Sequence, residues 1–304
     1  MKHKLIIASF GSGSTYFQRS ATFWIRELIN NQITNPHELL NGIAFKDDYL
    51  IKQWTKVTDQ SFKTITNLIQ SSQRPILARL SYDHLLLRND SPEDLENFYL
   101  FLNDNFDIYT CYRDDLLDYG LCWAIRRCTD REEQFQINCV HSPEDRARLY
   151  PEDAKFVINP ELVVEQAEKY LKYKSWAQKT FPNSLPVHYD TIESNIDSLL
   201  EKYFPASQTI KQKYGISIHE YCRYKYDLSI ALQSKNDLQH SSDFINAITN
   251  IDSVLDYMCK EKILLDSIPV KSTTTEDKML KISNYKDTKQ YFDQWIKDNQ
   301  QLGN

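Results

Sequence analysis

The feature that most constrains the fold of this chain is a strand, turn and helix pattern close to its start. An apolar run over residues 5–10 leads into the turn 11–15, whose sequence is GSGST, and a helical pattern follows over residues 16–25. Glycines let a backbone approach an anion closely, and the first N–H groups of a helix face such an anion. The pattern predicts a phosphate-binding turn, with an ordinary ligand-free turn as the alternative.

Two well-known phosphate-binding patterns do not fit this turn. A Walker A loop needs a Lys directly before its hydroxyl residue, whereas Gly13 is followed at once by Ser14. The dinucleotide pattern G-x-G-x-x-G also fails, because Phe17 stands near the place of the third glycine. A nucleotide kinase is therefore only a remote alternative.

Composition excludes several functional classes. The chain has 304 residues, of which 41% are hydrophobic, and a formal net charge of −6; these values indicate a substantial core and argue against a general nucleic-acid-binding surface. No apolar run approaches the roughly 18 residues of a membrane span, and the chain starts with a strand pattern instead of a signal peptide. Six cysteines without a C-x-x-C pair indicate reduced thiols and no metal site. We expect a cytoplasmic protein with neither nucleic acid nor a membrane as partner.

Apolar strand patterns alternate with helical patterns up to residue 203. The strongest helix start is Ser91-Pro92, with Ser at the N-cap and Pro at the first helical position. Further strands are predicted over residues 76–80, 107–112 and 185–189, and further helices over residues 59–70, 114–127, 160–179 and 192–203. This alternation predicts an α/β fold, in which helices flank a parallel sheet and ligands bind at the carboxyl ends of the strands.

The domain organisation is predicted to be simple. Residues 1–304 are expected to form one α/β domain, with a core over residues 1–205 and a mainly helical C-terminal portion over residues 206–304. No internal repeat and no long linker interrupts the sequence.

Four segments together resemble PAPS-dependent sulfotransferases, in particular the bacterial and viral-type members that act on carbohydrates. Residues 12–17 resemble the loop that holds the 5′-phosphosulfate, and residues 35–41 are similar to a segment that follows the first helix in this family. Residues 109–123 resemble the second cofactor motif, and residues 187–192 a later strand-to-helix corner. The resemblance implies a P-loop-like central sheet and transfer of a sulfuryl group from 3′-phosphoadenosine-5′-phosphosulfate (PAPS) to a hydroxyl, with PAP as the product. A glycan is the expected acceptor.

The resemblance also implies a cofactor site built from two parts of the chain. The turn would hold the phosphosulfate, and Arg113 would hold the 3′-phosphate; an ion pair of Arg113 with an aspartate at 114, 115 or 118 is the alternative. The implied cofactor-binding residues are Gly11, Ser12, Gly13, Ser14, Thr15, Tyr16, Arg113 and Cys122.

Two residues depart from the family pattern. Gly11 stands where the family usually has Lys or Arg, and Cys122 stands about where a Ser is expected, although a thiol is the weaker donor. Arg19, Arg79 or Lys271 is a candidate source of the missing charge. These departures keep open a second hypothesis, a nucleotide- or glycan-binding or structural protein that retains the scaffold without turnover.

Sulfuryl transfer to a hydroxyl also needs a general base. Glu38 resembles the acidic base of bacterial carbohydrate members and is the first choice; a carboxylate at a helix start is its alternative reading. His84, just past the predicted strand 76–80, lies near the place of the catalytic His in cytosolic members, with an ordinary loop histidine as the alternative. Acceptor specificity is expected to lie in the loops 45–58 and 129–153.

Overall fold

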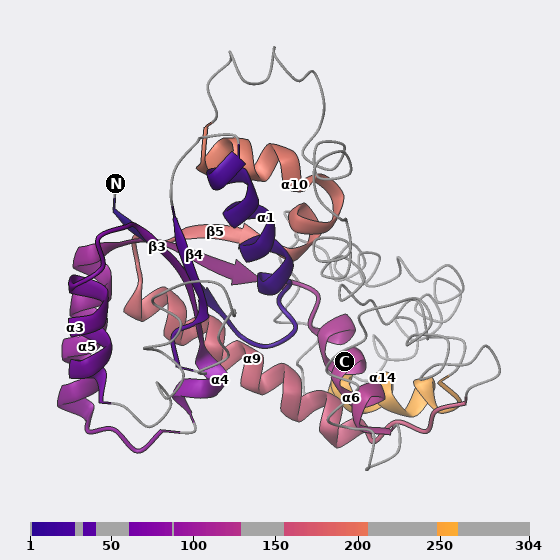
Figure 1. The fold of residues 1–304 in the computed structure, drawn as a ribbon. Helices are drawn as coiled ribbons and strands as arrows, with labels where there is room; N and C mark the ends of the chain where they lie inside the picture. Colours follow the sequence, from indigo (N-terminus) through magenta and orange to yellow (C-terminus); the bar gives the residue numbers. More distant parts are fainter. Residues whose placement is uncertain are drawn as a thin grey trace. The chain divides into compact units, whose positions relative to one another are not determined.

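The computed structural model describes residues 2–27, 33–40, 61–86, 88–128, 155–205 and 248–260 (Figure 1). The strands are β1 (His3–Ala8), β2 (Thr34–Glu38), β3 (Ile76–Ser81), β4 (Phe106–Tyr112) and β5 (Leu185–His188). The helices are α1 (Ser14–Glu27), α3 (Phe62–Gln70), α4 (Tyr82–Leu85), α5 (Pro92–Asn105), α6 (Leu116–Cys128), α9 (Pro160–Thr180), α10 (Tyr189–Tyr203) and α14 (Ile251–Lys260). All the strand pairs are parallel, so the predicted α/β fold with a parallel sheet flanked by helices is confirmed.

The described residues fall into two compact units. The first unit holds the whole sheet together with α1, α3, α4, α5 and α10. The second unit begins at Arg113 and holds α6 and α14, and helix α9 passes from the second unit into the first at Tyr173. The predicted single domain and its soft boundary near residue 205 stay predictions, because residues 206–247 and 261–304 lie outside the described residues.

The strands lie in the order β2-β3-β1-β4-β5, with β1 in the centre. The chain builds one half of the sheet by leaving β1 for β2 and β3, and then crosses to β4 and β5 in the other half. Open α/β sheets bind ligands beyond the carboxyl ends of the strands at such a change of direction. Three features lie at this edge: the loop 9–13 follows β1, Glu38 ends β2, and α4 follows β3.

Local sequence explains why these elements form. In β1, the run Leu5-Ile6-Ile7 is fully buried, as expected of a strand covered by helices on both faces. Ser91 caps α5 by accepting a hydrogen bond from the backbone N–H of Asp94, so the predicted helix start is confirmed.

Strand β2 lies where the sequence predicted no strand. Pro36 cannot donate a backbone hydrogen bond, but β2 is an edge strand, where that donor is not needed. The pairing with β3 also shifts register between Thr34 and His37. The alternative reading of Glu38 as a carboxylate at a helix start is therefore wrong, because Glu38 ends a strand.

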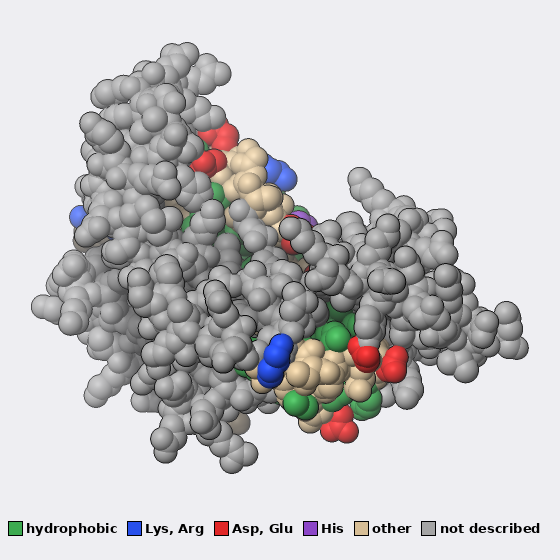
Figure 2. Space-filling model, turned by 90° about the vertical axis from the view of Figure 1, so that its right-hand side faces the viewer, with side chains coloured by type: hydrophobic (Ala, Val, Ile, Leu, Met, Phe, Trp, Pro, Cys, Tyr) green, Lys and Arg blue, Asp and Glu red, His purple; other side chains and the backbone are tan. Residues whose placement is uncertain are grey.

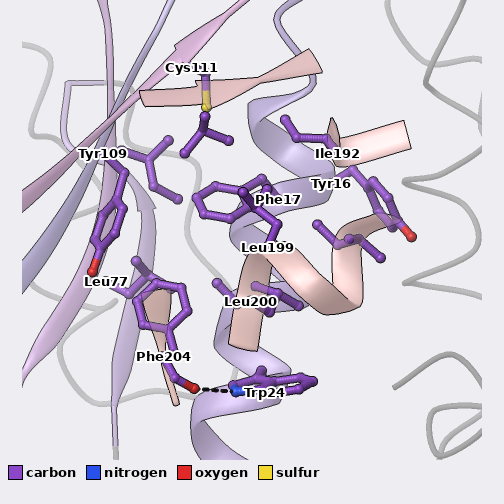
Figure 3. Packing of buried hydrophobic residues seen from close by; sticks show 14 of the residues in the cluster. Tyr16, Phe17, Trp24, Leu77, Tyr109, Cys111, Ile192, Leu199, Leu200 and Phe204 are labelled. Carbon is purple, nitrogen blue, oxygen red and sulfur yellow. Dashed lines mark hydrogen bonds between the residues drawn. The ribbon is translucent and has the colours of Figure 1, made fainter. Parts of the chain in front are cut away.

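Helices α1 and α10 pack against each other and cover one side of the sheet, while α3 and α5 lie together on the other (Figure 1). Figure 3 shows the core under α1, where Phe17 lies among side chains of β4 and α10. Trp24 donates its indole N–H to the backbone carbonyl of Phe204 at 2.7 Å. This packing holds α1, and with it the end of the glycine turn, against the sheet.

The helices within the described ranges include none with the length and hydropathy needed to cross a bilayer. On the face shown in Figure 2, acidic and basic side chains are interspersed among polar and hydrophobic ones. No extended basic patch gathers on that face among the residues that the structure describes.

Candidate functional site

The loop 9–13 joins β1 to α1 in a turn that depends on glycine. Gly11 and Gly13 have φ angles of 81° and 74°, in the left-handed region that favours glycine. The buried Ser12 donates its hydroxyl to the carbonyl of Ser9 at 2.7 Å, and its backbone N–H bonds to the same oxygen at 3.3 Å. The hydroxyl of Ser12 therefore closes the turn, and its implied role in cofactor binding stays a prediction.

Gly13 also has a packing role. A Cβ atom at Gly13 would lie 3.0 Å from Cδ2 of Tyr189 and 3.4 Å from Cδ1 of Ile192. Both contact residues belong to the segment 187–192, so the structure brings two of the family-like segments together. Tyr16 is buried in the hydrophobic core, and its side chain serves packing.

Arg79 reaches the glycine turn from the neighbouring strand β3. Its Nη1 donates to Oγ1 of Thr15 and lies 3.5 Å from Oγ of Ser14. Both hydroxyls belong to the first turn of α1, whose backbone N–H groups have no intrahelical acceptor. A cation is unfavourable at the positive end of a helix dipole, so an anion placed there would stabilise both the guanidinium and the helix end. Arg79 thus supplies a charge beside the turn, as one of the three residues considered for that role.

Glu38 holds Arg79 in this position. The two residues are register partners in β2 and β3, and Oε2 of Glu38 accepts from Nε of Arg79 at 2.7 Å. Its other oxygen, Oε1, accepts the backbone N–H of Ser81 at 2.9 Å. Burial raises the pKa of Glu38, but the charge and hydrogen bond of the Arg79 guanidinium, together with the neighbouring His84, outweigh that effect and hold the pKa below its ordinary value. Glu38 is therefore an ionised carboxylate with both oxygens engaged.

His84 lies on α4, beside the same carboxylate. Its Nδ1 is 3.8 Å from Oε1 of Glu38, and its ring meets the ring of Phe10 edge to face at a centroid distance of 5.0 Å. The side chain of His84 is 16% exposed, against 2% for Glu38. A general base must reach the proton that it removes, and His84 is the more exposed of the two candidate bases. The sequence-based preference for Glu38 as the base stays a prediction.

Two residues close to Arg79, Glu38 and His84 were not singled out from the sequence, namely Ser81 and Asp83. Oδ2 of Asp83 accepts the hydroxyl of Ser9 and the backbone N–H of Phe10, each at 2.9 Å. Neither residue carries a motif. Their position just beyond the predicted strand 76–80 is the one signal that points to them.

Arg113 and Cys122 form a cluster with Asp118 in the second unit. Nη2 of Arg113 pairs with the carboxylate of Asp118 and lies 3.6 Å from Sγ of Cys122. The side chains of Arg113 and Asp118 are each 4% exposed. The ion pair that the sequence offered as the alternative role of Arg113 is thus present, and phosphate binding by Arg113 and Cys122 stays a prediction.

Within the described ranges, no group of three or more His, Cys, Asp or Glu residues is arranged to hold a metal ion. Lys271, the third residue considered as a source of charge, and the expected acceptor loops 45–58 and 129–153 lie outside these ranges. No family model matches the chain, and no curated protein sequence matches it.

Proposed function

We propose that this chain is a sulfotransferase that moves a sulfuryl group from PAPS to a hydroxyl of a carbohydrate. The observation that carries the proposal is the contact of Arg79 with the hydroxyls of Ser14 and Thr15 at the start of α1. A left-handed glycine turn, a helix N-terminus and a fixed guanidinium form a donor set that suits a phosphosulfate. The resemblance over residues 4–203 is the reason for choosing PAPS among such anions.

Each side chain of the cluster has a role in this chemistry. When bound, PAPS supplies a sulfuryl group whose bond to a phosphate oxygen breaks as a new S–O bond forms. Arg79 and the N–H groups of the turn stabilise the negative charge that collects on the leaving phosphate, and Glu38 keeps the guanidinium in place beforehand. Nδ1 of His84 faces the Glu38 carboxylate, which favours a proton on Nδ1 and leaves Nε2 to accept the proton of the acceptor hydroxyl.

The proposal includes a P-loop-like scaffold, and the central position of β1 directly before the glycine turn supports it. The mainly helical C-terminal portion and the cytoplasmic location belong to the same proposal and stay predictions.

A nucleotide- or glycan-binding or structural protein without turnover is the second candidate, and one observation in the second unit agrees with it. The carboxylate of Asp118 already neutralises Arg113, the cation that the resemblance assigns to the 3′-phosphate. Gly11 and Cys122, which depart from the family pattern, agree with this candidate.

Incubation of the purified chain with sulfur-labelled PAPS and a mixture of carbohydrates tests the two candidates. We expect labelled carbohydrate, with a yield that falls in a His84→Asn variant. Thermal stabilisation by PAP without transfer to any acceptor would favour the binding protein, since a ligand at 100 times its Kd adds about 2.7 kcal/mol to stability. No stabilisation by PAP or PAPS would overturn the sulfotransferase and the nucleotide-binding protein alike.

A further inference from the structure

The loop that begins the proposed phosphate site is tied to α4 by a single carboxylate. Oδ2 of Asp83 accepts hydrogen bonds from Oγ of Ser9 and from the backbone N–H of Phe10, both at 2.9 Å. Asp83 and Ser9 are buried, and the bonded residues are 73 and 74 positions apart in the chain. The two bonds therefore join the exit of the central strand β1 to the exit of its neighbour β3.

The next residue of α4 contacts the same loop residue. The rings of His84 and Phe10 meet edge to face, with centroids 5.0 Å apart and an interplanar angle of 77°. Phe10 is 37% exposed, so burial alone does not fix its ring. Asp83 holds the backbone of Phe10, and the ring of Phe10 in turn contacts the imidazole proposed as the base.

We propose that Asp83 is a positioning residue. It holds the glycine turn and, through Phe10, the imidazole of His84 in a fixed position relative to each other. This inference rests on the proposed function, in which the turn binds an anion and His84 takes a proton. A carboxylate would repel a bound phosphosulfate, so Asp83 acts through its two bonds to the loop and does not contact the ligand.

The bonds of Asp83 act on the glycine turn through the residues that join them in the chain. Phe10 directly precedes the turn with its two left-handed glycines, and the turn ends at Ser14, where Arg79 makes contact. Without an acceptor at Asp83, the hydroxyl of Ser9 and the backbone N–H of Phe10 would lose these two hydrogen bonds, which disfavours this conformation of the loop. The turn and the imidazole would then no longer be held relative to each other.

Hydrogen exchange of the Phe10 amide, measured by NMR on the ligand-free chain, tests the tie directly. Asp83→Leu keeps a similar size without an acceptor, and we expect it to speed the exchange by about tenfold or more. Asp83→Asn keeps a neutral carbonyl oxygen, so a smaller rise is expected. If Asp83→Leu fails to fold, the exchange rate is measured in Asp83→Asn instead. Exchange of the Phe10 amide at the wild-type rate in the variant measured would overturn the inference.

Asp107→Leu is the matched control. Asp107 pairs with Lys4 at 3.1 Å and lies at the opposite, amino-terminal edge of the sheet. We expect its replacement to leave the exchange of the Phe10 amide unchanged. If the Phe10 amide exchanged equally faster in Asp107→Leu and in Asp83→Leu, the cause would be a general loss of stability, and the inference would be overturned.

Transfer kinetics separate a positioning role from a structural one. At saturating PAPS and in the folded state, Asp83→Leu should lower kcat by about tenfold or more, since small displacements of catalytic groups are costly, whereas Asp107→Leu should not. A normal kcat and normal PAP affinity in Asp83→Leu would overturn the inference while the proposed function stands. Failure of the wild-type chain to bind PAP would overturn the proposed function, and the exchange experiment would still decide whether Asp83 holds the loop.

Discussion

Glu38 and Arg79 face each other across β2 and β3, with Oε2 and Nε 2.7 Å apart. The same guanidinium continues to the hydroxyls of Ser14 and Thr15. The pair thus connects an edge strand of the sheet to the turn that follows the central strand. An anion bound at the start of α1 would depend on Glu38, because Glu38 holds Arg79 in place. The anion would not need to contact Glu38 itself.

Replacing Glu38 by Gln should destabilise the fold, because Arg79 would keep its charge where only 14% of its side chain is exposed. Removing one partner of a buried ion pair costs about 3–5 kcal/mol, which urea unfolding would measure. Asp107→Asn removes a carboxylate that is 43% exposed, against 2% for Glu38, so breaking its pair with Lys4 should cost less than breaking the pair of Glu38 with Arg79. Equal losses in the two variants would contradict a buried pair.

The same variant has a predicted pH dependence. The pKa of Glu38 is lower in the folded chain than its ordinary value of 4.5, so ionisation of Glu38 adds stability above that pH, and this stability is lost as the pH falls through the folded pKa. The difference in unfolding free energy between wild type and Glu38→Gln should therefore shrink below about pH 4.5. A difference that stays constant from neutral to acidic pH would contradict the assigned charge.

Replacing Gly13 by Ala should also destabilise the fold. A left-handed backbone costs a residue other than glycine about 1–2 kcal/mol, and the added Cβ would lie only 3.0 Å from the buried ring of Tyr189. We expect a loss of at least 1–2 kcal/mol in urea unfolding. A loss below about 0.5 kcal/mol, the range of ordinary surface substitutions, would contradict the contact.

His84→Asn and Glu38→Gln together decide which residue takes the proton. The His84 variant should keep PAP affinity and lose about 10²- to 10⁴-fold in kcat, the usual contribution of a positioned base. The Glu38 variant should weaken PAP binding as well, because it releases Arg79. Near-normal turnover in His84→Asn with collapse of kcat alone in Glu38→Gln would instead make Glu38 the base.

Arg113→Ala tests the role in phosphate binding that the resemblance implies for Arg113. If Arg113 holds the 3′-phosphate, the variant should weaken PAP binding by roughly 1.5–3 kcal/mol in calorimetry, the strength of a charged hydrogen bond. Asp118→Asn serves as the control, since it removes the carboxylate and keeps the guanidinium. Unchanged PAP affinity in Arg113→Ala would assign this residue to its ion pair with Asp118 alone.

Much of the fold follows from local sequence. The apolar run of β1, the capping pair Ser91-Pro92 and the periodic helices carry their signals within a few residues, and these elements form close to where they are predicted. Strand β1 spans His3–Ala8, two residues ahead of the apolar run 5–10. Strand β2 was missed because its sequence, TNPHE, is short and polar and its pairing with β3 is decided far along the chain. Helix α10 begins at Tyr189, three residues ahead of the predicted start at residue 192. Its N-cap residue, His188, makes no side-chain capping hydrogen bond, so the sequence holds no capping signal for this start.

The sequence predicted individual residues of the candidate site but not the contacts between them. The turn, Glu38 and His84 were each found from the sequence, and Arg79 was one of three candidate cations. The pairing of Arg79 with Glu38 depends on the register between β2 and β3, which no local pattern reveals. Ser12 shows the opposite case, because its residue type suits a phosphate donor while the fold uses its hydroxyl to close the turn.

Calorimetric titration with PAP of the wild-type chain, Arg79→Met and Arg88→Met tests the central claim most directly. Arg88 is the matched control, because it also pairs with a carboxylate, Asp90, and has a similarly buried side chain, 13% exposed. The account predicts that wild type and Arg88→Met bind PAP, and that Arg79→Met binds at least tenfold more weakly, the scale of one charge-assisted hydrogen bond. Equal affinity in all three chains, or no binding by the wild type, would contradict it.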